Sequence, residues 1–259
     1  MDAELLVQTR DARGVVTLTL NDPVRFNALG APMLEALQSA LTELATDTGV
    51  RLVVLAAQGK AFCAGHNLKD MAAHPQLDYY QDLFAQCSRM MLSIARLPVP
   101  VIARVQGMAT AAGCQLVAQC DLAVASTHAS FATSGIQYGL FCATPSVPLV
   151  RNIPFKQAME MLLTGDFMDA ETAQSRGLVN RVVVPGELDA EVEKLVQAIV
   201  QKPATAVRMG KELLYRQREL GLQAAYQLAG EVMACNMMDA DAQEGAQAFA
   251  QKRVPHWRQ

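Results

Sequence analysis

Three short segments made almost entirely of apolar residues place the tightest limit on the fold. They read "RLVVLAAQG" at 51–59, "PVPVIARVQG" at 98–107 and "CDLAVAS" at 120–126. A strand buried on both faces gives such an uninterrupted apolar run, and this burial is typical of parallel sheets. Helical segments separate the three runs, as crossover connections between parallel strands require. The sequence therefore predicts an α/β chain with a mostly parallel sheet.

Further patterns extend this core on both sides. Residues 14–21 alternate like a half-buried strand, and leucines recur at helical spacing through 30–49, between an early proline and a closing glycine. From residue 154 onward the patterns are nearly all helical, apart from one short apolar segment at 177–185. We therefore expect an N-terminal β/α core and a C-terminal helical region, without a Gly/Ser linker between them.

Charge and cysteine spacing argue against several classes of protein. The net charge is −3 and no basic run occurs, so neither nucleic acid nor a membrane is expected as a partner. The six cysteines show no CxxC spacing and the four histidines are scattered, so no metal site and no disulfide framework is predicted. The first residues lack the pattern of a signal peptide, and a cytoplasmic location is the expectation.

Two junctions between a predicted strand and a predicted helix are the candidate chemical sites. They read "GKAFCAGHNLKDM" at 59–71 and "QGMATAAGCQLVAQCD" at 106–121. Ligands of open α/β sheets bind beyond the carboxyl ends of strands, where the first N–H groups of a helix lack partners. Small residues in both junctions would let a substrate approach the backbone, so two N–H groups could form an oxyanion hole. The alternative is that these small residues only permit close helix packing.

A resemblance to a known family adds to this interpretation. The segments "AFCAGHNLKD", "VIARVQGMATAAGCQLVAQCDLAVAS", "ASFATSGIQYGL" and "MLLTGDFMDAETAQSRGLVNRVV", in this order, closely resemble the crotonase superfamily of enoyl-CoA hydratases and isomerases. The resemblance implies a spiral of ββα repeats over 1–195 that carries an acyl-CoA site. It also implies a helical region at 196–259 through which the chain forms a homotrimer, or a hexamer built from two trimers. Coenzyme A would enter only as part of the thioester substrate.

The resemblance also assigns site residues. The backbone N–H groups of His66 and Ala112 would form the oxyanion hole. Lys69 and Arg25 would suit the phosphates of CoA. Phe249 and Lys252 would close over CoA, from the tail of the same chain or from a neighbouring subunit. The full set of residues implied to contact CoA is Arg25, Ala64, His66, Asn67, Leu68, Lys69, Phe249 and Lys252.

The chain departs from the family pattern where hydratases place two glutamates. Here Gln115 stands in the "GCEL" context and Gly135 in the "F-x-x-P-E" context. An amide can hold a water but cannot take its proton, and glycine has no side chain. His66, Tyr138 and Cys142 are the candidate replacements. The alternative to a catalytic role is that the His66 imidazole faces solvent or the CoA phosphates, and that Tyr138 and Cys142 only pack against their neighbours.

Two further positions bear on a possible role for an aspartate. Asp121 precedes a predicted strand and is expected to be structural. The position of the nucleophilic aspartate of dehalogenases in the family falls near Ala143, so dehalogenation by that route is not expected.

The functional prediction is an acyl-CoA-binding enzyme of enoyl-CoA hydratase/isomerase type, in fatty-acid or other acyl-CoA metabolism, with an oxyanion hole but without the standard glutamate pair. One alternative is a non-catalytic, regulatory binder of acyl-CoA. Another is a decarboxylase, which forms an enolate without removing a proton, or a thioesterase.

Overall fold

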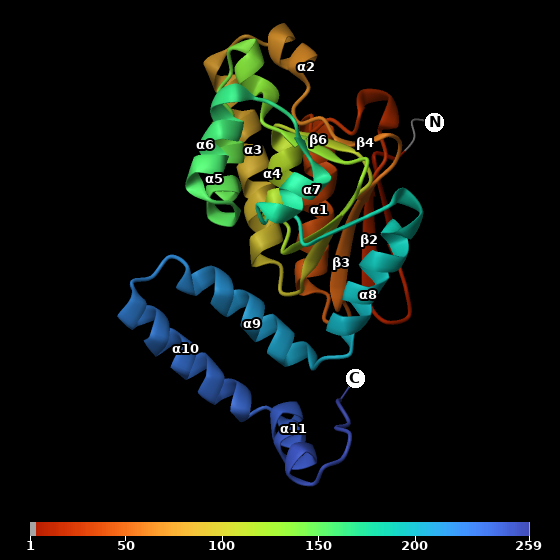
Figure 1. The fold of residues 1–259 in the computed structure, drawn as a ribbon, viewed down its shortest axis with the longest axis vertical. Helices are drawn as coiled ribbons and strands as arrows, with labels where there is room; N and C mark the ends of the chain where they lie inside the picture. Colours follow the sequence, from red (N-terminus) through yellow and green to blue (C-terminus); the bar gives the residue numbers. More distant parts are fainter. Residues whose placement is uncertain (1–3, 259) are drawn as a thin grey trace.

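The larger of two sheets forms the centre of the computed structural model, which describes residues 4–258 (Figure 1). It has six strands in the order β1-β2-β3-β5-β7-β10. Neighbouring strands are parallel except for the antiparallel pair β1 and β2. The bounds are Leu6–Arg10, Val15–Leu20, Leu52–Ala57, Val101–Val105, Leu122–Ser126 and Arg181–Val183. The mostly parallel sheet predicted from the apolar runs is confirmed.

The smaller sheet has four strands in the order β4-β6-β8-β9, of which only β8 and β9 are antiparallel. Its strands are Ala61–Cys63, Met108–Thr110, Ser130–Ala132 and Met168–Asp169. β4, β6 and β8 each follow directly after a strand of the larger sheet and lead into a helical segment. This alternation is the ββα spiral, and it confirms the fold class.

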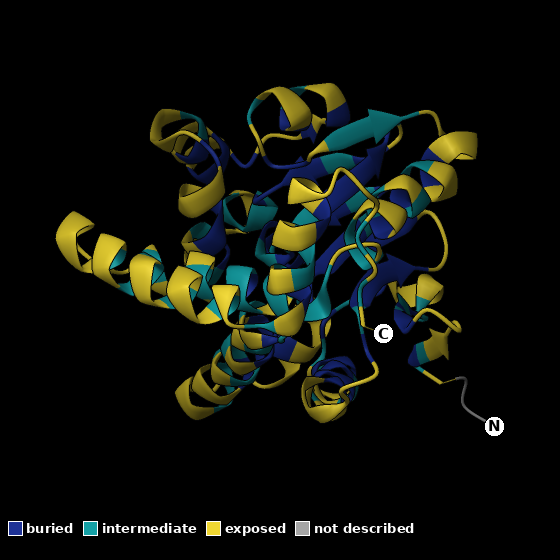
Figure 2. Cartoon of the chain, turned by 90° about the horizontal axis from the view of Figure 1, so that it is seen from below, coloured by how far each residue is buried: buried dark blue, intermediate teal, exposed yellow. Residues whose placement is uncertain are grey.

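Most helices of the first 180 residues pack over one face of the larger sheet. Their bounds are α1 Ala31–Thr46, α2 Leu68–Ala73, α3 Leu77–Arg96, α4 Ala112–Gln119, α5 Ala143–Asn152, α6 Phe155–Thr164 and α7 Ala170–Ser175. The main hydrophobic core lies between these helices and the sheets. Figure 2 shows this core as the dark blue interior beneath largely exposed helices. Three 3₁₀ turns, at Pro23–Arg25, Ser134–Tyr138 and Pro185–Glu187, join the elements.

Helix α8, Leu188–Val200, covers the opposite face of the larger sheet. Leu188, Val192 and Val196 on this helix are buried in a second apolar cluster that includes Leu52 and Ile102 of the strands. The predicted division between 195 and 196 therefore falls inside a helix that packs on the sheet. The chain leaves the sheet after α8.

The C-terminal helices are α9 Ala204–Gln217, α10 Leu222–Met237 and α11 Ala240–Ala250, and they extend away from the sheets (Figure 1). A buried ion pair anchors the first of them. Lys211 of α9 donates a hydrogen bond of 2.7 Å to Asp121, at the start of β7, and two of 2.9 Å to the carbonyls of Ile94 and Val99. The hydroxyl of Tyr215 donates to the other oxygen of Asp121. Asp121 is thus a structural carboxylate, as expected.

The C-terminal region exposes large apolar side chains. Leu222, Tyr226, Met233 and Met238 are all more than two thirds exposed, and Phe249 is 87% exposed. Among the described residues, no helix is long and apolar enough to cross a bilayer.

Candidate active site

The first junction lies between β4 and α2. Gly65 has a φ of +83°, a conformation that suits glycine, and its N–H points to the sulfur of Cys63. Asn67 caps α2 by accepting a hydrogen bond from the N–H of Lys69 at 3.1 Å. The N–H of His66 lies between these two bonded groups, and it has no acceptor within residues 4–258. The junction therefore presents one free backbone donor.

The second junction lies between β6 and α4. Ala111 caps the helix with φ 49° and ψ −119°, a strained conformation for a residue with a Cβ. Its own N–H is bonded to the carbonyl of Ala132, and its carbonyl accepts from Gln115. Ala112 is the first residue of the helix, so its N–H has no intrahelical acceptor. None of the other described residues supplies one.

The two junctions touch each other. A Cβ added to Gly65 would lie 2.9 Å from the nitrogen of Ala112, and one added to Gly113 would lie 2.1 Å from the carbonyl oxygen of Cys63. The Thr110 hydroxyl also donates to the carbonyl of Ala64. Glycines at 65 and 113 are therefore needed for close approach. The segments that carry the two sequence-predicted donors, His66 and Ala112, are thus in contact. Two backbone donors that converge on one point can bind one oxyanion.

Asn27 organises the first junction and is a residue that the sequence analysis missed. Its side chain is fully buried, donates to the carbonyls of Gln58 and Ala61 at 2.9 and 3.0 Å, and accepts from the N–H of Asp22. Phe26 and Asn27 both have a φ of 54°. The only sequence signal was the residue type, because asparagine tolerates left-handed backbone better than most residues.

This left-handed turn clamps the oxyanion loop through the backbone. The N–H of Ala64 donates to the carbonyl of Phe26, and the N–H of Leu29 donates to the carbonyl of Gly65 at 2.8 Å. The Nδ1 atom of His66 lies 2.9 Å from the carbonyl oxygen of Leu29. The positions of the peptide and of the imidazole are thus set by residues nearly 40 positions earlier in the chain.

His66 is partly buried, and its imidazole points into the protein. Its ring packs against that of Phe84 of α3, with centroids 5.5 Å apart. The Nε2 atom is buried and has no partner among residues 4–258. Burial lowers the pKa of His66 below its ordinary 6.5, and the bond to the Leu29 carbonyl partly opposes this shift.

Gln115 sits in the first turns of α4 and is only 3% exposed. Its Oε1 atom is buried, and no donor from the described chain reaches it. A buried polar atom left unpaired costs about 1–3 kcal/mol, so its presence calls for an explanation such as a ligand or a bound water. Within the described residues, the junction segments 59–71 and 106–121 thus carry three unpaired buried side-chain atoms, on His66, Gln106 and Gln115.

Gly135 lies in the 3₁₀ turn before α5, and the turn is built around it. A Cβ at this position would lie 2.6 Å from the carbonyl oxygen of Leu140 and 2.9 Å from the sulfur of Cys142. Burial raises the pKa of the Cys142 thiol, which makes it a poor nucleophile. Tyr138 is 73% exposed, on the surface of the turn. Cys142 is therefore better explained as a packing residue than as a catalytic one. Ala143 is the first residue of α5.

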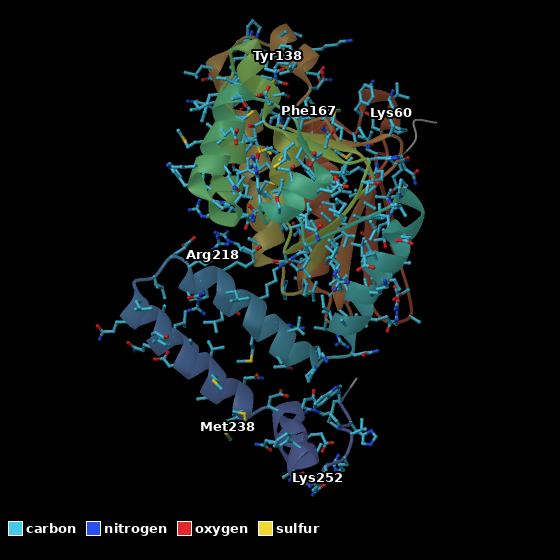
Figure 3. All side chains as sticks on the ribbon, viewed as in Figure 1. Lys60, Tyr138, Phe167, Arg218, Met238 and Lys252 are labelled. Carbon is cyan, nitrogen blue, oxygen red and sulfur yellow. The ribbon has the colours of Figure 1, made fainter. Side chains whose placement is uncertain are left out.

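The residues implied to contact CoA are only partly gathered. Arg25, Leu68 and Lys69 are exposed around the first junction, where Arg25 forms an ion pair of 3.4 Å with Asp22. Phe249 and Lys252 lie at the opposite end of the molecule from α2, as the position of Lys252 in Figure 3 shows. They do not close over this site within one chain. Residues 4–258 also contain no cluster of three side chains able to ligate a metal.

Comparisons with known proteins agree with this geometry. Residues 10–259 match the profile of the family described as enoyl-CoA hydratase/isomerase. The chain is 44% identical to the mitochondrial enoyl-CoA hydratase domain-containing protein 3 of Xenopus laevis, over 97% of this chain and 86% of that protein. A crystal structure of an enoyl-CoA hydratase from Mycobacterium smegmatis is 61% identical, with a TM-score of 0.98 over 98% of this chain and 99% of that chain.

The crystal structure of human enoyl Coenzyme A hydratase domain-containing protein 3 is 41% identical, with a TM-score of 0.94 over 98% of this chain and 100% of that chain. Sequence, fold and the two apposed strand-to-helix junctions lead to the same conclusion, which is that this chain belongs to the enoyl-CoA hydratase/isomerase family.

Proposed function

We propose that the chain binds acyl-CoA thioesters and acts on them by stabilising negative charge on the thioester oxygen. The observation that carries this proposal is the pair of unpaired backbone N–H groups on His66 and Ala112, at junctions in direct contact. The oxygen gains charge when the thioester is converted to an enolate, and preformed donors favour that state over the ground state. Each such donor is worth roughly 3–4 kcal/mol to a transition state.

The CoA moiety would lie along the first junction. Lys69 and Arg25 are exposed there, and Arg25 has only a long ion pair of 3.4 Å with Asp22. Both cations are therefore available to phosphate groups. Loss of a hydrogen bond to a charged group costs about 1.5–3 kcal/mol, so Lys69→Ala should weaken binding by about that amount. Lys156→Ala, on an exposed position of α6, is the control that should leave affinity unchanged.

A non-catalytic acyl-CoA binder is the second candidate. It is favoured by Gln115 and Gly135, because neither supplies a group that could take up a proton. Under this alternative the oxyanion hole would recognise the thioester without converting it.

Two measurements on the purified protein test these proposals. Calorimetry should show that butyryl-CoA binds, that free CoA binds more weakly, and that Lys69→Ala loses affinity. Loss of the absorbance of crotonyl-CoA then tests for hydration. Turnover at about 10 per second would eliminate the non-catalytic alternative. Equal affinity for butyryl-CoA in Lys69→Ala and in the unsubstituted protein would remove Lys69 from the site, and absence of any binding would refute the proposed function.

We also propose that the chain forms a homotrimer, or a hexamer of two trimers, through its C-terminal helices. Exposed apolar side chains on α10 and α11 would be covered in such an assembly. Phe249 and Lys252 could then reach the CoA site of a neighbouring subunit. Sedimentation as a monomer would refute this assignment. The cytoplasmic location stays a prediction, and the mitochondrial name is that of the Xenopus laevis relative.

A further inference from the structure

The hydrogen bond at Nδ1 determines which form of the His66 imidazole the structure holds. A carbonyl oxygen can only accept a hydrogen bond, so Nδ1 must carry the hydrogen that it donates to Leu29. In the neutral ring the lone pair is then on Nε2, which is the atom left buried and without a partner in the described chain. The clamp on the first junction therefore presents Nε2 as an unused proton acceptor.

The same residue supplies a donor to the oxyanion hole. In the proposed function, the N–H of His66 holds the thioester oxygen, and the α-carbon of the acyl group is two bonds from that oxygen. Leu29 positions both the backbone N–H and the imidazole of His66. Its N–H donates to the neighbouring carbonyl of Gly65, and its carbonyl accepts from Nδ1 of the ring. The candidate proton acceptor and one of the two oxyanion donors are therefore carried by a single residue that Leu29 holds in place.

We propose that Nε2 of His66 is the proton acceptor of this site and does the work for which a glutamate is absent at 115 and 135. This inference rests on the proposed function. The Nε2 lone pair forms a bond to the α-proton, and the electrons of the broken C–H bond move into the enolate. The negative oxygen is held by the two N–H groups. The imidazolium then returns a proton from Nε2 to the α-carbon, so the ring ends neutral.

Gln115 has a different role in this arrangement. Its buried and unpaired Oε1 cannot remove a proton from carbon, but it can accept a hydrogen bond from a water or from a hydroxyl of the acyl chain. It would therefore orient a ligand and leave the proton transfer to His66.

The charged side chains on the elements around His66 lie mostly on the surface. They are Asp22 and Arg25 on the preceding turn, Lys69 and Asp70 on α2, and Asp78, Asp82, Arg89 and Arg96 on α3, and of these only Asp22 is partly buried. The shift in the pKa of His66 arises from burial and from the Leu29 carbonyl, without a contribution from a charge. The lowered pKa keeps the ring neutral, and hence able to accept a proton, through the physiological range.

The test is exchange of the α-protons of butyryl-CoA in D₂O, followed by proton NMR at a concentration that saturates the protein. This probe does not require the natural acyl chain, and deuterium enters the α-carbon when the proton on Nε2 exchanges with solvent before it is returned. General-base catalysis typically contributes 10²–10⁴-fold. We therefore expect His66→Phe to exchange at least 100-fold more slowly than the unsubstituted protein, while the affinity for butyryl-CoA changes less than threefold.

Two further variants keep the test decisive. His66→Gln should show the same loss if His66→Phe does not fold. His74→Gln is the matched control, because His74 also bonds a backbone carbonyl through Nδ1 but is exposed at the end of α2. Exchange by the unsubstituted protein should rise with pH up to the lowered pKa of His66 and level off above it. Both His66 variants should lack this rise.

Two results would overturn the proposal. They are undiminished exchange in both His66 variants, or binding of butyryl-CoA without any exchange. A loss of affinity with unchanged exchange per bound ligand would show instead that His66 only recognises the thioester. Failure of the unsubstituted protein to bind butyryl-CoA would refute the proposed function itself, and the inference with it.

Discussion

The ion pair between Lys211 and Asp121 should contribute far more to stability than a surface pair of the same length. Its N···O distance is 2.7 Å, and the two side chains are 7% and 15% exposed. Lys194 and Glu191 of α8 form a pair at 2.6 Å in which the lysine is 68% exposed. The two carboxylates are similarly buried, but of the two lysines only Lys211 is buried, and it also bonds two backbone carbonyls, so the second pair serves as a surface reference.

The structure sets the expected magnitude. Removing one partner of a buried pair costs about 3–5 kcal/mol, because the other charge is left uncompensated. Here Asp121 would keep two donors, the N–H of Val101 and the hydroxyl of Tyr215, so Lys211→Met should lie at the low end, at about 3 kcal/mol. That loss corresponds to a fall in Tm of roughly 6–12 °C for a domain of this size. Lys194→Met should cost less than about 1 kcal/mol.

Urea unfolding measures both variants, at one fixed protein concentration because association stabilises the folded state. Asp121→Asn and the double variant complete a cycle. The double variant removes both charges, so its loss should be smaller than the sum of the single losses by about 1 kcal/mol or more. A loss below 1 kcal/mol for Lys211→Met, or strictly additive losses, would refute the assignment of α9 anchoring to this pair.

Two smaller predictions concern the backbone and the tail. Ala111→Gly should raise the free energy of unfolding by about 1 kcal/mol, because relief of the strained φ outweighs the added flexibility of glycine; destabilisation in urea would contradict this. Glu244 is bonded by Arg253 and by the N–H of His256, which lower its pKa to about 2. Because this pKa is lowered, the ionised Glu244 stabilises the folded tail at pH values above 4.5. That stabilisation is lost as the pH falls toward 2. The fluorescence of Trp257, the single tryptophan, should therefore shift to the red over that range, and Glu244→Gln should remove the dependence.

The larger sheet could be predicted from sequence because its central strands are long, apolar and buried on both faces. The strands β4, β6 and β8 could not, since three residues are too short to show a period. Their existence follows from tertiary contacts, because β4 pairs with β6 and β6 pairs with β8. Only the family resemblance indicated them beforehand.

The backbone part of the candidate site was equally predictable, because N–H groups at a strand-to-helix junction are free whatever side chains they carry. The placement of the His66 imidazole was not. It depends on the Leu29 carbonyl, which the left-handed turn at Phe26 and Asn27 brings to the ring. No local pattern around residue 66 contains that information, so sequence reasoning had to leave solvent, CoA and catalysis open as roles for the side chain.

Positions 115 and 135 differ in how easily each could accept a glutamate. A carboxylate at 115 would replace an amide of the same shape, so Gln115→Glu changes chemistry while the fold of α4 stays the same. A glutamate at 135 would place its Cβ 2.6 Å from the Leu140 carbonyl, whose residue donates its own N–H back to Gly135. The turn would have to open before any carboxylate could act there. A carboxylate at 115 and one at 135 are therefore not equivalent changes, because the first needs only a new side chain and the second also needs a rearranged turn.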